Sequence, residues 1–155
     1  MSPFVYYIKN YKIKPDLIMK KYEILEHPAE LRFKVYGKTI EELFINAAEA
    51  MANILKRRLT QTKRRPTRIK EKIKIQSVDL NSLLVDFLSE ILAKSQINKC
   101  VYHVSKLKIQ NSKLIATLIG YPVKRFDEDI KAVTYEDLNI QKINGIWQTN
   151  LVFDI

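Results

Sequence analysis

Two segments of this chain carry apolar residues on one helical face only, and this pattern limits the possible folds more than any other feature. The first follows Thr39, which forms a capping-box pattern with Glu42, and the second follows Asp79, a favourable N-cap residue. Helical spacing is shown by Ile40, Leu43, Phe44, Ala47, Ala48, Met51, Ile54 and Leu55, and by Leu80, Leu83, Leu84, Phe87, Leu88, Ile91 and Leu92. Because each helix buries one face, the sequence predicts helices layered on a sheet.

Most of the remaining chain alternates apolar and polar residues, as strands with one buried face do. The expected strands are 31–36, 68–76, 107–109, 114–118, 138–143 and 147–153. Asn144-Gly145 predicts a tight hairpin between the last two, and Gln110-Asn111-Ser112 predicts a turn after 107–109. Short connections favour antiparallel pairing, so the expected fold class is α+β.

The length of 155 residues suits a single domain, and no apolar run approaches the ~18 residues that a membrane span needs. The lone Cys100 excludes an internal disulfide and a zinc site built from several cysteines. Without a secretory signal, a cytoplasmic location is expected. Residues 1–20 lack clear periodicity, so we assign them to an N-terminal extension and 21–155 to the domain. Met1 and Met19 are both candidate translation starts.

The net charge of +10 is concentrated in one segment, residues 56–74. This segment has ten basic residues and one acid, so it carries +9 and the rest of the chain about +1. The candidate contacts to RNA phosphates or to an acidic partner are Arg57, Arg58, Lys63, Arg64 and Arg65. No aromatic residue in the segment could stack on a base, so base-specific recognition is not expected. A solvated connector explains the same composition equally well.

The motifs of common enzyme classes are absent from the sequence, which has no Gly-rich phosphate loop, paired-His zinc motif or nucleophile elbow. Two acids next to strand-like runs, Glu30 and Asp154, remain of interest. Together with the terminal carboxylate they could supply hard oxygen ligands for Ca²⁺ or Mg²⁺. Spacing alone favours the simpler interpretation that both are solvated acids at strand ends.

Four sequence blocks, in order and with consistent spacing, resemble the archease family. The first combines 22–30 with 33–44, and the second is 79–90. The third is Lys131-Ala132-Val133-Thr134-Tyr135, and the fourth is the closing Val152-Phe153-Asp154-Ile155. The resemblance covers about residues 22–155.

This resemblance implies a small α+β sandwich, with two amphipathic helices packed on a mainly antiparallel sheet, and a protein cofactor rather than an enzyme. Archeases assist the RtcB-type tRNA-splicing RNA ligase by promoting its guanylylation and its multiple turnover. The resemblance also implies a divalent metal, Ca²⁺ or Mg²⁺, bound by Glu30, Asp154 and Ile155, the last through backbone or terminal oxygens. No membrane partner is implied.

The chain departs from the family pattern at three positions. Pro28 stands where Thr is usual, Glu30 where Asp is usual, and Glu136 where His is frequent. Glu30 keeps the charge but moves the carboxylate outward by roughly 1.5 Å, which calcium tolerates better than magnesium. We expect His27 and Glu136 to lie near the metal, although a solvated turn acid remains the simpler interpretation of Glu136.

Two other functions are compatible with the sequence. One is a small basic RNA-binding protein acting through residues 56–74. The other is a metal-dependent hydrolase using the same acids, which is disfavoured because no evident base or nucleophile accompanies them.

Overall fold

The computed structural model describes residues 21–27, 30–57 and 68–155, so the expected extension 1–20 lies outside the described residues. Its elements, in chain order, are β1 (Tyr22–His27), β2 (Glu30–Gly37), α2 (Ile40–Leu55), β3 (Ile69–Gln76), α3 (Leu80–Asn98), β4 (Cys100–Gln110), β5 (Lys113–Pro122), β6 (Ala132–Val133), β7 (Gln141–Ile143) and β8 (Ile146–Asp154). None of the helices in these ranges is long and apolar enough to cross a membrane.

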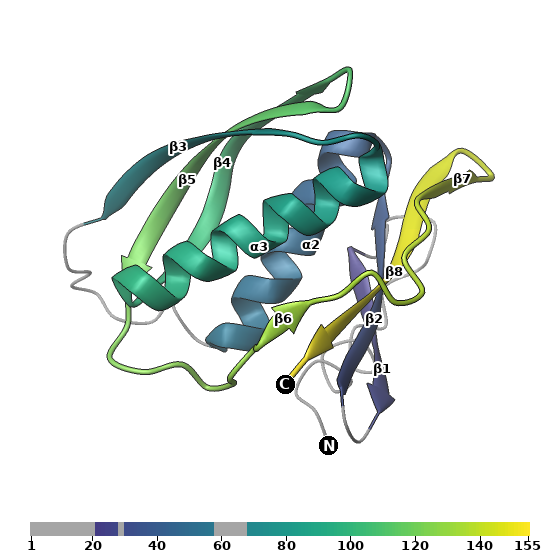
Figure 1. The fold of residues 1–155 in the computed structure, drawn as a ribbon. Coiled ribbons are helices and arrows are strands. Elements are labelled where there is room, and N and C mark those ends of the chain that lie inside the picture. The colour runs from purple at the N-terminus through teal and green to yellow at the C-terminus, as the bar shows by residue number, and fades with distance from the viewer. Residues whose placement is uncertain (1–20, 28–29, 58–67) are drawn as a thin grey trace.

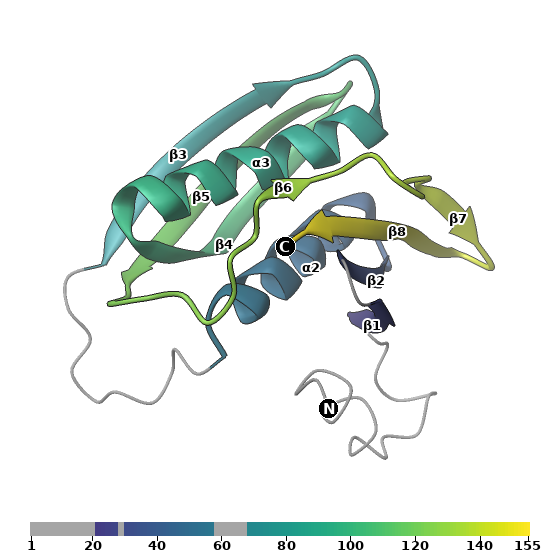
Figure 2. The ribbon, with the colours of Figure 1, turned by 60° about the horizontal axis from the view of Figure 1, so that its bottom comes forward.

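The strands form two antiparallel sheets, which confirms the α+β class. One has the order β1-β2-β8-β6, with β7 also paired to β8, and the other has the order β3-β5-β4. Helix α2 contacts β2 of the first sheet and β4 of the second, whereas α3 lies across the strands of the second sheet (Figures 1 and 2). The helices therefore join the two sheets into one core.

Both helices begin at the predicted caps. The side chain of Thr39 accepts a hydrogen bond from the backbone N–H of Glu42, and Asp79 accepts one from Ser82. The predicted apolar faces are buried apart from the partly buried first residues Ile40 and Leu80, and Phe44 of α2 meets Phe87 of α3 with ring centroids 5.9 Å apart. These interactions are local or lie on one helical face, which is why the sequence predicted them.

Helix α2 is buried on more of its circumference than a one-faced helix would be. Asn46, Ala50 and Ala52 are buried as well as the predicted face. The side-chain amide of Asn46 donates to the carbonyl oxygen of Tyr36 at 2.7 Å, so this polar group is satisfied. The difference arises because α2 lies between two sheets, and the small alanines allow close approach on the second side.

The predicted hairpins are present with different strand lengths. Asn144 and Gly145 have positive φ between β7 and β8, as the Asn-Gly signal requires, but β7 covers only Gln141–Ile143 of the expected 138–143. Strand β4 is longer than predicted because it begins at Cys100. Its register with β5 shifts between Val104 and Lys106, and this bulge hides the alternation in the sequence.

The end of α2 is held in place by Asp127. Its carboxylate accepts hydrogen bonds from the backbone N–H of Arg57 at 2.9 Å and from Lys56 Nζ at 3.2 Å. Its own backbone N–H donates to the carbonyl oxygen of Leu55 at 2.8 Å. The Arg57 hydrogen bond is the main reason why the pKa of Asp127 is lowered.

Replacing Asp127 with Ala should lower the free energy of unfolding at pH 7. A carboxylate with a lowered folded pKa stabilises fully above its unfolded pKa, and this stabilisation is lost as the pH falls through the folded pKa. The difference from wild type should therefore shrink as the pH falls below about 3.9, as urea unfolding at several pH values would show. Asp129→Ala removes a neighbouring exposed acid as the control. An equal loss in the control, or a difference that grows in acid, would contradict this role.

Candidate metal centre

Glu30 and Asp154 lie opposite each other on adjacent strands. The antiparallel register of β2 and β8 pairs Glu30 with Asp154 and Arg32 with Val152. Directly opposed residues of an antiparallel pair project from the same face, with Cβ atoms about 4.5–5.5 Å apart. The register thus brings together two acids from opposite ends of the domain sequence.

The same cross-strand row continues onto both neighbouring strands. His27 of β1 pairs with Glu30, and Ala132 of β6 pairs with Asp154. The backbone therefore places His27 in register with the two acids, while its side chain lies outside what the structure describes. The row orders the positions as His27, Glu30, Asp154 and Ala132 across the sheet.

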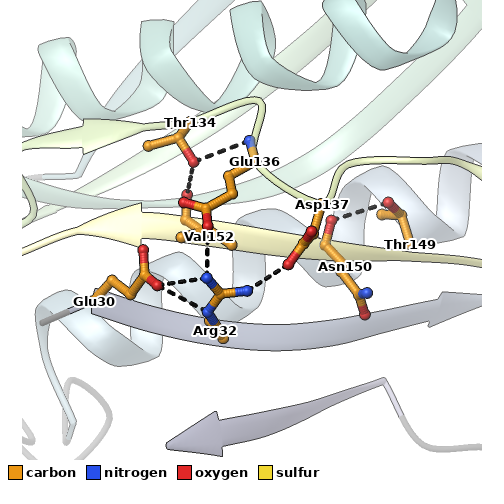
Figure 3. Close-up of polar contacts among 8 residues, drawn as sticks. All are labelled: Glu30, Arg32, Thr134, Glu136, Asp137, Thr149, Asn150 and Val152. Carbon is orange, nitrogen blue, oxygen red and sulfur yellow. Dashed lines mark hydrogen bonds and ion pairs between the residues drawn. The ribbon is translucent and has the colours of Figure 1, made fainter. Parts of the chain in front are cut away.

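An arginine that the sequence analysis did not single out lies at the centre of this surface. Arg32 is two residues after Glu30 on the same face of β2, and its Nε and Nη2 donate to Glu30 Oε1 at 2.8 and 2.6 Å. Its Nη2 also donates to Glu136 Oε1 at 2.6 Å, and its Nη1 pairs with Asp137. Figure 3 shows one guanidinium joining these three carboxylates. Glu136 therefore lies near Glu30, with Arg32 between them.

The carboxylates hold Arg32 firmly in its charged form. They raise the pKa of the guanidinium above its ordinary value, and the hydrogen bonds to Glu30 are the largest cause. The Glu30 side chain is 12% exposed, whereas those of Glu136 and Asp137 are 50% and 51% exposed. The Glu30–Arg32 pair is therefore the most sheltered part of the cluster. The pairs with Glu136 and Asp137 are more open to solvent, and such ion pairs contribute little to stability.

The block after β6 positions Glu136 and Asp137 over Arg32. The backbone N–H of Thr134 donates to the carbonyl oxygen of Val152 at 3.0 Å. The Oγ1 of Thr134 donates to the same oxygen at 2.9 Å (Figure 3). The backbone N–H of Glu136 then donates to Thr134 Oγ1 at 3.3 Å. These bonds fasten the turn to β8, so the 131–135 block acts as a support for the acidic turn.

The oxygen donors of Glu30, Asp154 and Ile155 are of the type that hard cations prefer. The Asp154 side chain is exposed, and its carboxylate makes no hydrogen bond or ion pair with the part of the chain that the structure describes. Within that part, no three side chains of His, Cys, Asp or Glu gather as a metal cluster. The donors fit a divalent cation only if Ile155 adds oxygens and if the cation shares or displaces Arg32 at Glu30.

The basic segment predicted as a partner contact is described only near its two ends. Arg57 is exposed, and its backbone is bound to Asp127. Arg58, Lys63, Arg64 and Arg65 lie outside the described residues, so their role stays a prediction. At the other end, Lys70, Lys72 and Lys74 are exposed on β3.

Comparisons with known proteins bear on the fold and the family of this chain. The model of the Archease protein family matches residues 22–155. Archeases of Methanosarcina mazei and Methanosarcina barkeri are 36% and 39% identical to this chain over 145 residues, which are 88% of this chain and 97% of each relative.

Solved structures are similar as well. The solution structure of a Methanobacterium thermoautotrophicum protein has a TM-score of 0.67 and 26% identity, and the match covers 88% of this chain and all of that one. The crystal structure of a Thermotoga maritima archease, described as a possible chaperone, has a TM-score of 0.63 and covers 84% and 94% of the two chains. At 17% identity that match shows the fold alone. On the family match and these relatives together, the chain belongs to the archease family.

Proposed function

We propose that this chain is a protein cofactor, not an enzyme, that activates an RtcB-type RNA ligase during tRNA splicing in the cytoplasm. It promotes guanylylation of the ligase and lets the ligase turn over repeatedly. A divalent cation bound by Glu30, Asp154 and Ile155 belongs to this function. The observation that carries the proposal is the β2–β8 register, which pairs the two acids that the family resemblance assigns to the metal.

The charges of Glu30, Asp154 and Arg32 determine what this end of the sheet can bind. Glu30 and Asp154 carry negative charge side by side, and like charges this close repel unless a positive group offsets them. Arg32 supplies that positive group at Glu30, while Asp154 is exposed to solvent. A bound cation would neutralise both carboxylates and present positive charge to a phosphate or an acidic group of the ligase.

Calcium suits this donor set better than magnesium. Magnesium needs near-ideal octahedral geometry, whereas calcium accepts six to eight oxygens in flexible arrangements. Glu30 has a longer side chain than the usual Asp, and its Oε1 already accepts two hydrogen bonds from Arg32. A flexible coordination sphere is therefore the better match to a carboxylate in this position.

The alternative of a basic RNA-binding protein is supported by one described feature, the exposed lysines of β3. Because those lysines are on the other sheet from the Glu30–Asp154 pair, the two functions are compatible in one chain.

Arg32→Gln should bind Ca²⁺ several-fold more tightly than the wild type. The substitution removes the cation that competes for Glu30 and leaves its carboxylate uncompensated. For the same reason, the metal-free variant should have a lower thermal midpoint, and added Ca²⁺ should raise that midpoint more than in the wild type. Calorimetric titration and thermal unfolding would measure both effects. Lys34→Gln removes another cation from β2 as the control. Unchanged or weaker Ca²⁺ binding by Arg32→Gln would contradict competition between guanidinium and metal.

Asp154→Ala should fail to stimulate guanylylation and multiple-turnover ligation by the partner ligase while keeping the wild-type fold. Its side chain is exposed and supports little packing, so circular dichroism and thermal unfolding should change little. Glu30→Asp restores the usual family ligand and should retain or improve stimulation. Asp129→Ala, another exposed acid, should behave as wild type. Full stimulation by Asp154→Ala would disprove the proposed role of this residue.

A further inference from the structure

The three-stranded sheet carries matched rows of lysines on one face. In two successive cross-strand rows, a lysine on each edge strand flanks a neutral residue of the central strand β5. These rows are Lys72–Thr117–Lys106 and Lys74–Ile115–Lys108. Because directly paired residues project from the same face, all four lysines lie on one side of the sheet.

This side is the one turned away from the helices. Leu114, Ala116 and Leu118 alternate with the row residues of β5 and are buried, and α3 lies across that buried face (Figures 1 and 2). All four lysines of the two rows are exposed; of the two β5 residues between them, Ile115 is 46% exposed and Thr117 is buried. The lysines and Ile115 therefore form an open surface among the described residues.

No carboxylate on these strands offsets the lysines. The three strands contain six lysines and a single acid, Glu71. Glu71 pairs in register with Leu118 on the buried face, where Lys94 of α3 contacts its Oε1 at 3.3 Å. Within the described part of the chain, none of the lysines of β3 and β4 forms an ion pair. The positive charge of this face is therefore available to a binding partner.

One end of the lysine rows carries an aromatic group. The rings of Tyr121 and His103 meet edge to face with centroids 5.6 Å apart, and the guanidinium carbon of Arg68 lies 5.9 Å from the Tyr121 centroid. Aromatic side chains beside basic grooves are the usual platform for bases in sequence-independent binding of single strands.

The spacing of the charges follows the strands. The Cα atoms of lysines two residues apart on one strand are about 6.7 Å apart, and the Cα atoms of paired lysines on the two edge strands are about 9.6 Å apart. A single polyanionic strand running along β5 would have ammonium groups on both sides and a neutral floor beneath it. Edge lysines can also serve to prevent pairing between sheets, but that role does not require matched rows on both edges.

We propose that this face binds the phosphodiester backbone of an RNA strand without reading its sequence. This basic face comprises the four lysines of the two rows and their neighbours on the same side of the sheet, namely Arg68, Lys70, Lys72, Lys74, Lys106, Lys108 and Tyr121. Two of its lysines, Lys106 and Lys108, come from β4, which lies outside the basic segment 56–74. The inference is independent of the metal site, because the two surfaces belong to different sheets.

The test is fluorescence anisotropy of labelled single-stranded RNA of mixed sequence, titrated with the full chain at several salt concentrations. The variant replaces Lys72, Lys74, Lys106 and Lys108 with Gln. The control replaces four lysines of the other sheet and its connections, Lys34, Lys38, Lys131 and Lys142, and so changes the net charge equally. Thermal unfolding of both variants verifies that the fold is kept.

We expect the face variant to bind RNA at least about tenfold more weakly and the control to bind nearly as the wild type does. Each phosphate contact contributes about 0.7 to the salt slope for a single strand, so losing four contacts should flatten the slope by about 3. Equal binding by all three proteins, or equal weakening in both variants, would overturn the proposal. Displacement of the RNA by polyglutamate as readily as by unlabelled RNA would assign the face to an acidic protein instead.

Discussion

The antiparallel register between β2 and β8 is the constraint on which the first sheet and its surface depend. It joins the first part of the domain to its last strand, and it decides which side chains face the helices. On the inner face, the buried rings of Phe33 and Phe153 meet edge to face with centroids 4.8 Å apart. A shift of one residue would expose Phe33 and turn Glu30 and Arg32 into the core. Burial of the aromatic pair thus fixes the position of the polar groups on the other face.

The electrostatics of the outer face follow from that register. Glu30, Glu136 and Asp137 converge on one guanidinium, and Asp154 lies beside Glu30 with no counter-ion in the described part of the chain. The single guanidinium offsets only part of the charge of the three acids around it and leaves Asp154 uncompensated. This excess of negative charge is the physical basis for expecting a cation here. Because Arg32 is bound to Glu30, the cation must compete with the guanidinium for that carboxylate.

Local features of the fold were predictable from the sequence, and long-range ones were not. The caps at Thr39 and Asp79 and the Asn144-Gly145 turn depend on neighbouring residues, so their patterns are visible in the sequence. The burial of α2 between two sheets depends on packing that no local pattern encodes. The start of β4 was missed because its bulge interrupts the alternation.

The candidate site also contains features that the sequence predicted and features that only the fold shows. The family resemblance identified Glu30 and Asp154 as metal ligands, while residue spacing alone favoured two solvated acids at strand ends. Arg32 was visible only as the polar partner in an alternating strand, although its separation of two residues from Glu30 places both on one face. Asp137 joins the cluster through the turn after β6, where its φ is positive, and only the folded chain brings it to Arg32.

We propose that the β2–β8 register creates a cation site at Glu30 and Asp154. A crystal structure of the full chain grown with Ca²⁺ would reveal whether this site exists. We expect one ion with an oxygen of each carboxylate at about 2.3–2.6 Å, together with a weakened contact between Arg32 and Glu30. An ion bound elsewhere, with Arg32 still holding Glu30 and no density beside Asp154 at saturating Ca²⁺, would contradict it.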